Sequence, residues 1–267
     1  MDGLRFDVNL SILFTELPLL ERPAAARAAG FDAIEFWWPF PVAVPDDADV
    51  DRFVDAVAAA GVSLVGLNFF AGDLPAGDRG LLSWPGRRAE FRDSVAVAID
   101  IAERLGCPAF NALYGNRVDG YAPAAQDELA LENLTFAGEA AARIGASVLL
   151  EPLSGAPRYP LRRAADALAV LDRLPRRTNL RLLADLYHLA VNGDDLGAVV
   201  RGLIGRIGHV QLADAPGRHE PGTGALDVRG LLTALGAAGY TGHVGLEYVP
   251  SVSTVDSFGW LRVKEHS

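Results

Sequence analysis

The 267-residue chain is poor in cysteine and in cationic side chains. Its one cysteine, Cys107, cannot form an internal disulfide, and no Cys/His cluster has the spacing of a zinc finger. Lys and Arg number 24 against 34 Asp and Glu, so the net charge is −10 at pH 7. An acidic surface repels phosphate backbones and anionic lipids, which disfavours nucleic acid as a partner. The cysteine usage fits a reducing compartment.

The chain also lacks the long apolar segments that membranes and secretion require. No run of about 18 apolar residues occurs, and Asp2 and Asp7 lie where a signal peptide needs basic residues. The sequence is 50% hydrophobic and 22% charged, which is typical of globular domains and too apolar for disorder. No linker rich in Ser, Gly or Pro divides it. We therefore expect a cytoplasmic protein without a membrane partner, with residues 1–267 forming one domain.

A recurring junction organises the sequence. An Ala-rich segment with helical character ends at a glycine, and a β-branched or aromatic run begins at once. Glycine suits this position because helices often end in a left-handed residue, a conformation that costs glycine little. The junctions are Ala29-Gly30-Phe31, Ala60-Gly61-Val62, Leu105-Gly106-Cys107, Ile144-Gly145-Ala146 and Ala238-Gly239-Tyr240.

Eight expected strands alternate with eight expected helices. The strands are Arg5–Leu10, Phe31–Trp38, Val62–Phe70, Ala109–Tyr114, Ser147–Leu153, Leu180–Leu186, Ile207–Ala213 and His243–Tyr248. The helices are Leu17–Ala29, Val50–Ala60, Arg88–Leu105, Ala124–Ile144, Ala164–Leu174, Leu196–Gly205, Val228–Ala238 and Thr254–Lys264. Strand runs such as Val148-Leu149-Leu150 are continuously apolar, as parallel strands covered by helices should be. Eight units of about 33 residues predict an α/β fold, a closed (β/α)₈ TIM barrel, because open doubly wound sheets usually have fewer strands.

An oxygen-bearing side chain stands near the end of each of the last four strands. These residues are Glu151, Asp185, Gln211 and Glu247, separated by 34, 26 and 36 positions. Side-chain alternation allows all four to face the barrel axis, where three carboxylates would repel one another by several kcal/mol unless a cation lay among them. An all-oxygen set favours Mg²⁺ or Mn²⁺, with Zn²⁺ or Co²⁺ as alternatives. Salt bridges to arginines are the competing interpretation, favoured for any single carboxylate but not for four in register.

With these residues in view, the sequence resembles the hydroxypyruvate isomerase family of the xylose-isomerase-like barrels along nearly the whole chain. Gln211 together with Pro221-Gly222-Thr223-Gly224 is specific to that family, whereas the acids alone indicate only the wider superfamily. The other matching stretches are Phe6-Asp7-Val8-Asn9-Leu10-Ser11, Gly30-Phe31-Asp32-Ala33-Ile34-Glu35-Phe36, Ala71-Gly72-Asp73, Ala76-Gly77-Asp78-Arg79-Gly80, Glu151-Pro152, Asp185-Leu186-Tyr187-His188, His209-Val210-Gln211-Leu212-Ala213-Asp214 and Gly245-Leu246-Glu247-Tyr248.

The resemblance implies roles for six residues. Glu151, Asp185, Gln211 and Glu247 would hold one divalent cation, and Glu151 and Glu247 would also transfer protons. His188 and Arg218 would contact the substrate. After Glu151-Pro152 the family usually carries Asn and an Asp-x-Pro-Gly loop, but residues 153–160 here form a shorter segment. Because that loop borders the substrate, the departure leaves the substrate's identity open.

The expected reaction interconverts hydroxypyruvate and tartronate semialdehyde (2-hydroxy-3-oxopropanoate) through an enediolate. A cation would stabilise that anion, and a carboxylate would act as general base and acid. For the substrate carboxylate, His188 and Arg218 are the nearest candidates. The alternatives on the same barrel are a 2-oxo-tetronate isomerase and a sugar epimerase or inosose dehydratase. A DNA-repair endonuclease is disfavoured by the acidic charge, and a non-catalytic barrel that binds a small ligand is the remaining interpretation.

Several further residues have two interpretations each. His209 should face the interior beside Gln211, either bonded to a metal ligand or satisfied in the core. Glu35 and Asn68 would shape the pocket, although a hydrogen bond at the rim is equally plausible for Glu35. Trp37-Trp38 and Phe69-Phe70 would exclude water at the barrel mouth or pack against another subunit, with plain packing as the default. Exposed aromatics of this kind would favour a homo-oligomer.

Overall fold

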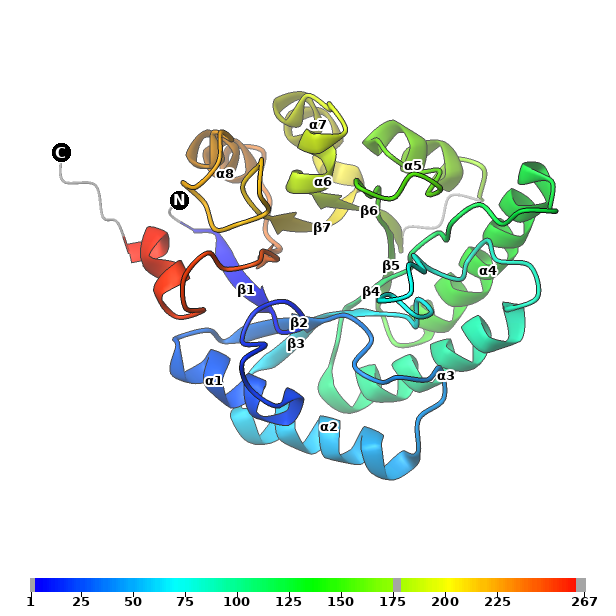
Figure 1. Cartoon of the computed structure of the whole chain (residues 1–267), viewed down its shortest axis with the longest axis horizontal. Helices are drawn as coiled ribbons and strands as arrows, with labels where there is room; N and C mark the ends of the chain where they lie inside the picture. Colours follow the sequence, from blue (N-terminus) through cyan, green and yellow to red (C-terminus); the bar gives the residue numbers. More distant parts are fainter. Residues whose placement is uncertain (1–2, 175–178, 263–267) are drawn as a thin grey trace.

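The computed structural model describes residues 3–174 and 179–262. Eight parallel strands close into a barrel in the order β1-β2-β3-β4-β5-β6-β7-β8, and helices surround them (Figure 1). The strands are β1 (Arg5–Asn9), β2 (Ala33–Phe36), β3 (Ser63–Asn68), β4 (Ala109–Asn111), β5 (Ser147–Leu150), β6 (Leu180–Asp185), β7 (Ile207–Leu212) and β8 (His243–Leu246). This confirms the (β/α)₈ prediction. None of the described helices is long and apolar enough to cross a bilayer.

The helices follow the strands with one addition and one change of type. They are η1 (Leu19–Glu21), α1 (Arg22–Ala28), α2 (Asp47–Ala60), α3 (Arg88–Leu105), α4 (Pro123–Arg143), α5 (Ala164–Leu171), α6 (Leu186–Val191), α7 (Leu196–Leu203), η2 (Ile204–Arg206), α8 (Val228–Ala237) and η3 (Asp256–Arg262). The short helix α6, directly after β6, was not predicted. The expected helix Thr254–Lys264 is instead the 3₁₀ helix η3, and residues 263–264 of that prediction lie outside the described residues.

Several strands are shorter than their apolar runs. β4 ends at Asn111, yet Ala112, Leu113 and Tyr114 remain buried. The loop between β3 and α3 covers them: Ser83 N donates to Tyr114 O at 2.8 Å, and Gly80 forms an antiparallel bridge with Tyr114. The apolar stretch Ala109–Tyr114 is therefore longer than β4 because its last three residues are buried under this loop and not within the sheet.

The core has two shells, which fix the direction of the strand ends. Ala109, Leu149 and Leu183 form a separate cluster inside the barrel, whereas Val148 and Leu182 belong to the larger core shared with the helices. Side chains alternate along a strand, so residues two positions beyond Leu149 and Leu183 also face inward. Those residues are Glu151 and Asp185, at the carboxyl end of the barrel, where such folds place their active sites.

Candidate active site

The structure brings the four predicted ligands together. Glu151, Asp185, Gln211 and Glu247 are each no more than 4% exposed. Ligand atoms of Glu151, Asp185 and the neighbouring His188 lie within 4.8 Å of one another, and Gln211 Nε2 donates to Glu247 Oε1 at 3.1 Å. Glu151 and Glu247 line a cavity of about 480 Å³ at the mouth of the barrel. Glu151 and Asp185 thus lie together, Gln211 bonds Glu247, and Arg218 connects the two pairs through Glu247 and Asp185.

Asp185 is oriented by the start of α6. It is the N-cap of that helix, and its Oδ1 accepts hydrogen bonds from the backbone N–H groups of Tyr187 at 2.8 Å and His188 at 3.1 Å. This satisfies donors that the first turn would otherwise leave unpaired. The other oxygen, Oδ2, is buried and accepts no hydrogen bond from the described residues. The cap therefore leaves one carboxylate oxygen available inside the barrel.

Gln211 also carries an available oxygen. Its Nε2 donates to Glu35 Oε1 at 2.9 Å and to Glu247 Oε1 at 3.1 Å, so the donor end of the amide faces these two acids. Gln211 Oε1 is thereby turned away, and it is buried without a partner among the described residues. Buried oxygens are rarely left unpaired. A divalent cation that prefers oxygen ligands fits Gln211 Oε1 and Asp185 Oδ2.

The electrostatics of the acids agree with this fit. Burial raises the pKa of Glu151 well above its usual range, and the nearby charges of Glu247 and Asp185 raise it further. Burial also raises the pKa of Glu247 to about 8, although Arg218 opposes the shift. Without a cation the protein would hold protons here, and a bound cation would favour the ionised carboxylates instead.

Three donors missed by the sequence reasoning hold the two glutamates. Glu247 Oε1 accepts from Asn9 Nδ2 at 2.8 Å and from Trp37 Nε1 at 2.7 Å, and Asn111 Nδ2 donates to Glu151 Oε2 at 2.7 Å. Asn9 and Asn111 end strands β1 and β4, so the signal that identified the last four strands would have found them too. The sequence contains no such signal for the hydrogen bond of Trp37, because Trp37 follows a strand and reaches Glu247 across the mouth of the barrel. Trp37 and Asn68 line the cavity, as expected, whereas Phe69 stacks on Phe110 in the core.

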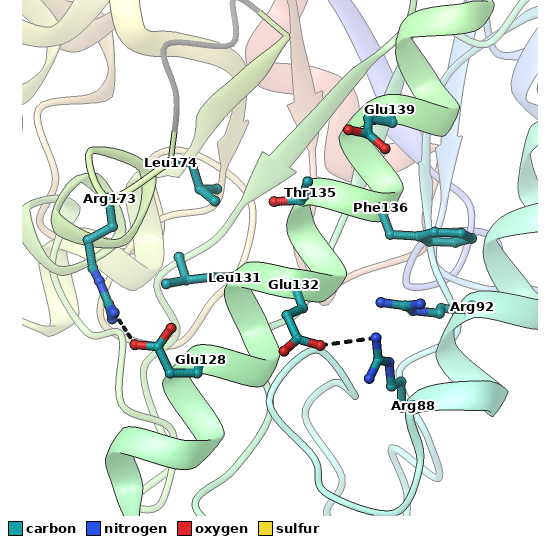
Figure 2. A pocket seen from close by; sticks show the side chains of 10 residues that line it. All are labelled: Arg88, Arg92, Glu128, Leu131, Glu132, Thr135, Phe136, Glu139, Arg173 and Leu174. Carbon is teal, nitrogen blue, oxygen red and sulfur yellow. Dashed lines mark hydrogen bonds and ion pairs between the residues drawn. The ribbon is translucent and has the colours of Figure 1, made fainter.

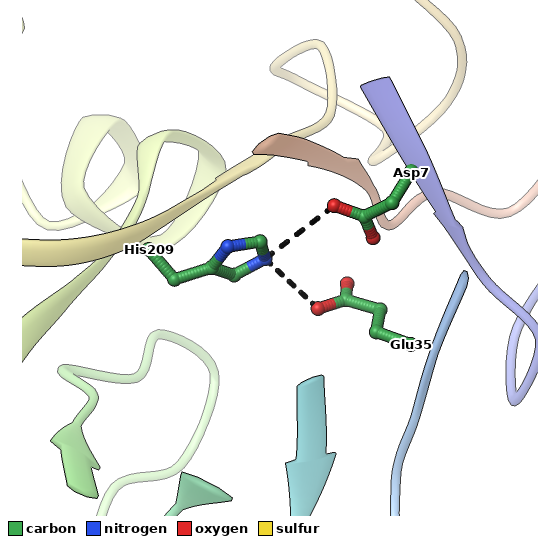
Figure 3. A group of neighbouring side chains, drawn as sticks. All are labelled: Asp7, Glu35 and His209. Atoms are coloured by element: carbon green, nitrogen blue, oxygen red, sulfur yellow. Dashed lines mark hydrogen bonds and ion pairs between the residues drawn. The ribbon is translucent and has the colours of Figure 1, made fainter. Parts of the chain in front are cut away.

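Asp7, Glu35 and His209 form a buried ionic cluster beside Gln211 (Figure 3). His209 Nε2 is 2.9 Å from Glu35 Oε2 and 3.9 Å from Asp7 Oδ2. Burial lowers the pKa of His209, but the charge and hydrogen bond of Glu35, together with Asp7 and Glu247, outweigh it and raise the value to about 9. The imidazolium therefore pairs with Glu35, which in turn holds the Gln211 amide. Among the described residues His209 bonds Glu35 and none of the four predicted metal ligands, so it reaches Gln211 only through Glu35.

Glu35 has room inside the barrel because two strand positions are glycines. A Cβ atom at Gly245 would lie 2.6 Å from Glu35 Oε1, and one at Gly66 would lie 3.1 Å from Glu35 Oε2. Asp7, the third member of the cluster, is fully buried, and both of its oxygens lack hydrogen-bond partners among the described residues. Burial, and then the charge of Glu35, raises the pKa of Asp7 well above its usual range. The cluster therefore favours an uncharged Asp7 next to a His209–Glu35 pair.

His188 presents an N–H group to the cavity. The backbone N–H of Ser154 donates to His188 Nδ1 at 3.1 Å, so in the neutral ring the proton sits on Nε2, which lies 3.6 Å from Asp185 Oδ2. Burial lowers the pKa of His188 to about 4, against the opposing charge of Asp185. His188 is therefore an uncharged hydrogen-bond donor at neutral pH. Ser154 belongs to the shortened segment after Glu151-Pro152.

Arg218 is directed at the acids by a strained loop. Its φ of 57° is left-handed, which costs a non-glycine residue about 1 kcal/mol or more. Val249 N donates to Arg218 O at 2.8 Å, and Gly222 N donates to Asp214 Oδ2 at 2.8 Å, which holds the Pro-Gly-Thr-Gly turn in place. The guanidinium Nη2 lies 2.5 Å from Glu247 Oε2 and 3.8 Å from an oxygen of Asp185. Arg218 thus contacts two of the predicted metal ligands.

A second hollow, of about 770 Å³, lies outside the barrel between α3 and α4 (Figure 2). Its charges are paired at the surface: Arg88 with Glu132 at 3.0 Å, and Arg173 with Glu128. Arg92 lies over the ring of Phe136, 4.7 Å from its centre. Exposed ion pairs of this kind contribute little to stability, and none of the predicted site residues lines this hollow. The barrel mouth is therefore the candidate active site.

Comparisons with known proteins agree with this architecture. The family model described as "Xylose isomerase-like TIM barrel" matches residues 23–264. A "Putative hydroxypyruvate isomerase" of Streptomyces coelicolor is 56% identical, over 96% of this chain and 95% of that protein. A "2-oxo-tetronate isomerase" of Cupriavidus necator is 36% identical, over 97% of each chain. A crystal structure described as "AP endonuclease, family 2", from Brucella melitensis, superimposes with a TM-score of 0.88 at 35% identity, covering 97% of this chain and 98% of that one. The chain belongs to the xylose isomerase-like TIM-barrel family and, within it, to the hydroxypyruvate isomerase family.

Proposed function

We propose that this isomerase of the hydroxypyruvate isomerase family depends on a divalent metal and interconverts hydroxypyruvate and tartronate semialdehyde through an enediolate. One observation carries the proposal. Glu151 and Glu247 line one cavity, and on the two strands between them Asp185 Oδ2 and Gln211 Oε1 are buried without a hydrogen-bond partner among the described residues. The relative at 56% identity bears the name of this activity.

Glu151, Asp185, Gln211 and Glu247 would hold the cation. Their oxygens suit Mg²⁺ or Mn²⁺ best, with Zn²⁺ or Co²⁺ as alternatives. When bound, a divalent ion polarises the substrate carbonyl and neutralises negative charge that develops on its oxygen. Asn9, Asn111 and Trp37 keep the two glutamates in place by donating to one oxygen of each.

Glu151 and Glu247 would move the proton. The reaction removes a proton from C3 of hydroxypyruvate and adds one to C2, while the C3 hydroxyl becomes the carbonyl and the C2 carbonyl becomes the hydroxyl. Glu151 follows β5 and Glu247 follows β8, so β6 and β7 separate them around the ring. They would approach a central substrate from different sides.

The proposal is tested with metal-free protein and a panel of added ions. Proton NMR in D₂O follows loss of hydroxypyruvate, appearance of tartronate semialdehyde and incorporation of deuterium. We expect turnover with Mn²⁺ or Mg²⁺ and none after chelation. Absence of turnover with Mg²⁺, Mn²⁺, Zn²⁺ and Co²⁺ alike would refute the assignment.

A second candidate is isomerisation of 2-oxo-tetronate, a four-carbon acid. It is favoured by the Cupriavidus necator relative of that name and by a cavity of about 480 Å³, which accommodates an additional hydroxymethyl group. Both reactions use the same residues. The ratio of the two kcat/KM values decides between them, and sugar-epimerase substrates in the same panel test the remaining activity considered for this barrel.

The remaining expectations concern partners and location. We propose a small oxo-hydroxy acid as the ligand instead of nucleic acid or a membrane, a cytoplasmic location, one domain over residues 1–267 and self-association into a homo-oligomer. Light scattering on the purified protein measures the oligomeric state. Binding to duplex DNA at low salt, absent in our expectation, would reopen the endonuclease interpretation that the name of the Brucella melitensis protein suggests.

A further inference from the structure

Two arginines line the candidate active site, and they differ in their partners. Arg218 faces Glu247 at 2.5 Å and Asp185 at 3.8 Å, so its charge is engaged by the predicted metal ligands, although its Nε is buried without a hydrogen-bond partner among the described residues. Arg79, in the loop between β3 and α3, also lines the cavity. Its Nη1 donates to the backbone oxygens of Leu74 at 3.0 Å and Asp78 at 2.6 Å. Among the described residues, neither Arg79 Nε nor Nη2 has a hydrogen-bond partner, and Arg79 forms no ion pair.

The neighbouring acid does not neutralise Arg79. Asp78 Oδ2 instead accepts from Arg87 Nη1 at 2.9 Å and from the backbone N–H of Asp73 at 2.8 Å. A half-buried guanidinium beside an unneutralised cavity is a site for an anion, because its planar fork matches a carboxylate. Its charge also reaches His188, whose pKa it helps to lower. Arg79 and His188 both line this cavity, so a ligand in it can meet the guanidinium and the neutral N–H of His188.

The backbone around Arg79 is held in one conformation. Gly80 has a φ of 108°, and a Cβ atom there would lie 2.0 Å from Leu113 O. Gly80 N donates to Ala71 O at 2.9 Å, and Gly115 N donates to Arg79 O at 3.0 Å. The loop is thus fixed to the segment that follows β4. A preorganised cation costs little entropy on binding, which increases its contribution to affinity.

The placement also suits a substrate that bridges the ring. The predicted metal ligands come from β5 to β8, whereas Arg79 follows β3, which stands opposite β7 in the closed order. We infer that Arg79 is the residue that binds the carboxylate of the substrate, while Arg218 serves the acids around the reacting carbons. This inference rests on the proposed function and adds to it a specificity-determining residue on the opposite wall. The family resemblance implies that Arg218 contacts the substrate, and this inference assigns the contact with the substrate carboxylate to Arg79 instead.

The test compares Arg79→Met, Arg79→Lys and the control Arg88→Met, which lies in the outer groove of Figure 2. Calorimetry with D-glycerate, a three-carbon acid that cannot react, measures binding without turnover. Loss of a charged hydrogen bond predicts a rise of about 10- to 100-fold in the glycerate Kd and in the KM for hydroxypyruvate for Arg79→Met. Arg79→Lys keeps the charge and a donor for the loop, and we expect an intermediate effect. Arg88→Met should behave as the wild type.

Two further measurements separate recognition from structure. Dihydroxyacetone lacks the carboxylate, so any turnover of it should be unchanged by Arg79→Met, and the Mn²⁺ affinity should be unchanged in both variants. Unchanged glycerate Kd and hydroxypyruvate KM would overturn the inference, as would an equal loss for dihydroxyacetone or for Mn²⁺. If the wild type turns over no oxo-acid, the proposed function fails, and the glycerate Kd still decides the role of Arg79.

Discussion

Replacing Glu247 by Gln tests the proton-transfer role and the electrostatics of the site together. The amide has nearly the shape of a carboxyl group, and its oxygen can keep the bonds that Asn9 and Trp37 donate to Glu247 Oε1. Its NH₂ group cannot accept from Arg218 and cannot exchange a proton with carbon. We expect kcat to fall by about 100- to 10,000-fold, the usual range for a general base, while the fold persists.

The stability of the metal-free protein gives the magnitude. Burial raises the pKa of Glu247 from 4.5 to about 8 in the folded state. A group with a raised pKa contributes stability that is present below its unfolded value and is lost as the pH rises through the folded value. Near about pH 5 the wild type and Glu247→Gln are both uncharged at this position and should unfold with similar free energies. Towards about pH 9 the wild type should lose a few kcal/mol relative to the variant, at about 1.4 kcal/mol per pKa unit.

Urea unfolding between these pH values measures the difference, and steady-state kinetics with Mn²⁺ measures kcat. Glu132→Gln, at an exposed position on α4, is the control and should alter neither quantity. Retained turnover in Glu247→Gln would remove Glu247 from the proton-transfer role. A stability difference that is independent of pH, or that grows in favour of the wild type, would refute the electrostatic reasoning.

Three other perturbations follow from the same geometry. Saturating Mn²⁺ should raise the melting temperature, because a free Mn²⁺ concentration of 100 times Kd stabilises the folded state by about 2.7 kcal/mol. Asp185→Asn should abolish most of that rise. Burial lowers the pKa of His188 from 6.5 to about 4, so the stability that this residue contributes is present above pH 6.5 and is lost as the pH falls towards 4. In urea unfolding, acidification should reduce the free energy of unfolding by about 3 kcal/mol less in His188→Asn than in the wild type. Equal reductions in the two proteins would contradict this reasoning. Gly245→Ala should displace Glu35, which should lower the free energy of unfolding by about 1–3 kcal/mol and weaken Mn²⁺ binding measured by calorimetry. The control Gly236→Ala, on α8 with open space around it, should change neither quantity.

The barrel was predictable because its repeat is written in local patterns. Helices end at left-handed glycines such as Gly61 and Gly106, and apolar runs mark strands covered on both faces. Local patterns also explain the errors. α6 has only six residues, too few for helical periodicity, and its capping residue Asp185 was interpreted solely as a ligand. η3 has Gly259 in its interior, which disfavours an α-helix by about 1 kcal/mol.

The convergence of Glu151, Asp185, Gln211 and Glu247 could be inferred from their register, since equivalent positions of a closed parallel barrel meet at one end. Their partners could not. Glu35 reaches Gln211 across 176 positions of sequence, through space that exists because Gly66 and Gly245 carry no side chains. Such contacts depend on which side chains fill the barrel, and no local periodicity records that.

The amino-acid sequence by itself determined the number of strand–helix units and the residue types at the carboxyl ends of the strands, because both follow from short-range propensity and alternation. The tertiary structure decided which oxygens remain without a hydrogen bond, and that Arg218 pairs with Glu247 and Asp185 whereas Arg79, among the described residues, pairs with no acid. Hydrogen bonding and desolvation act between atoms that the closed ring brings together, so their outcome depends on distances that the linear order of residues does not contain.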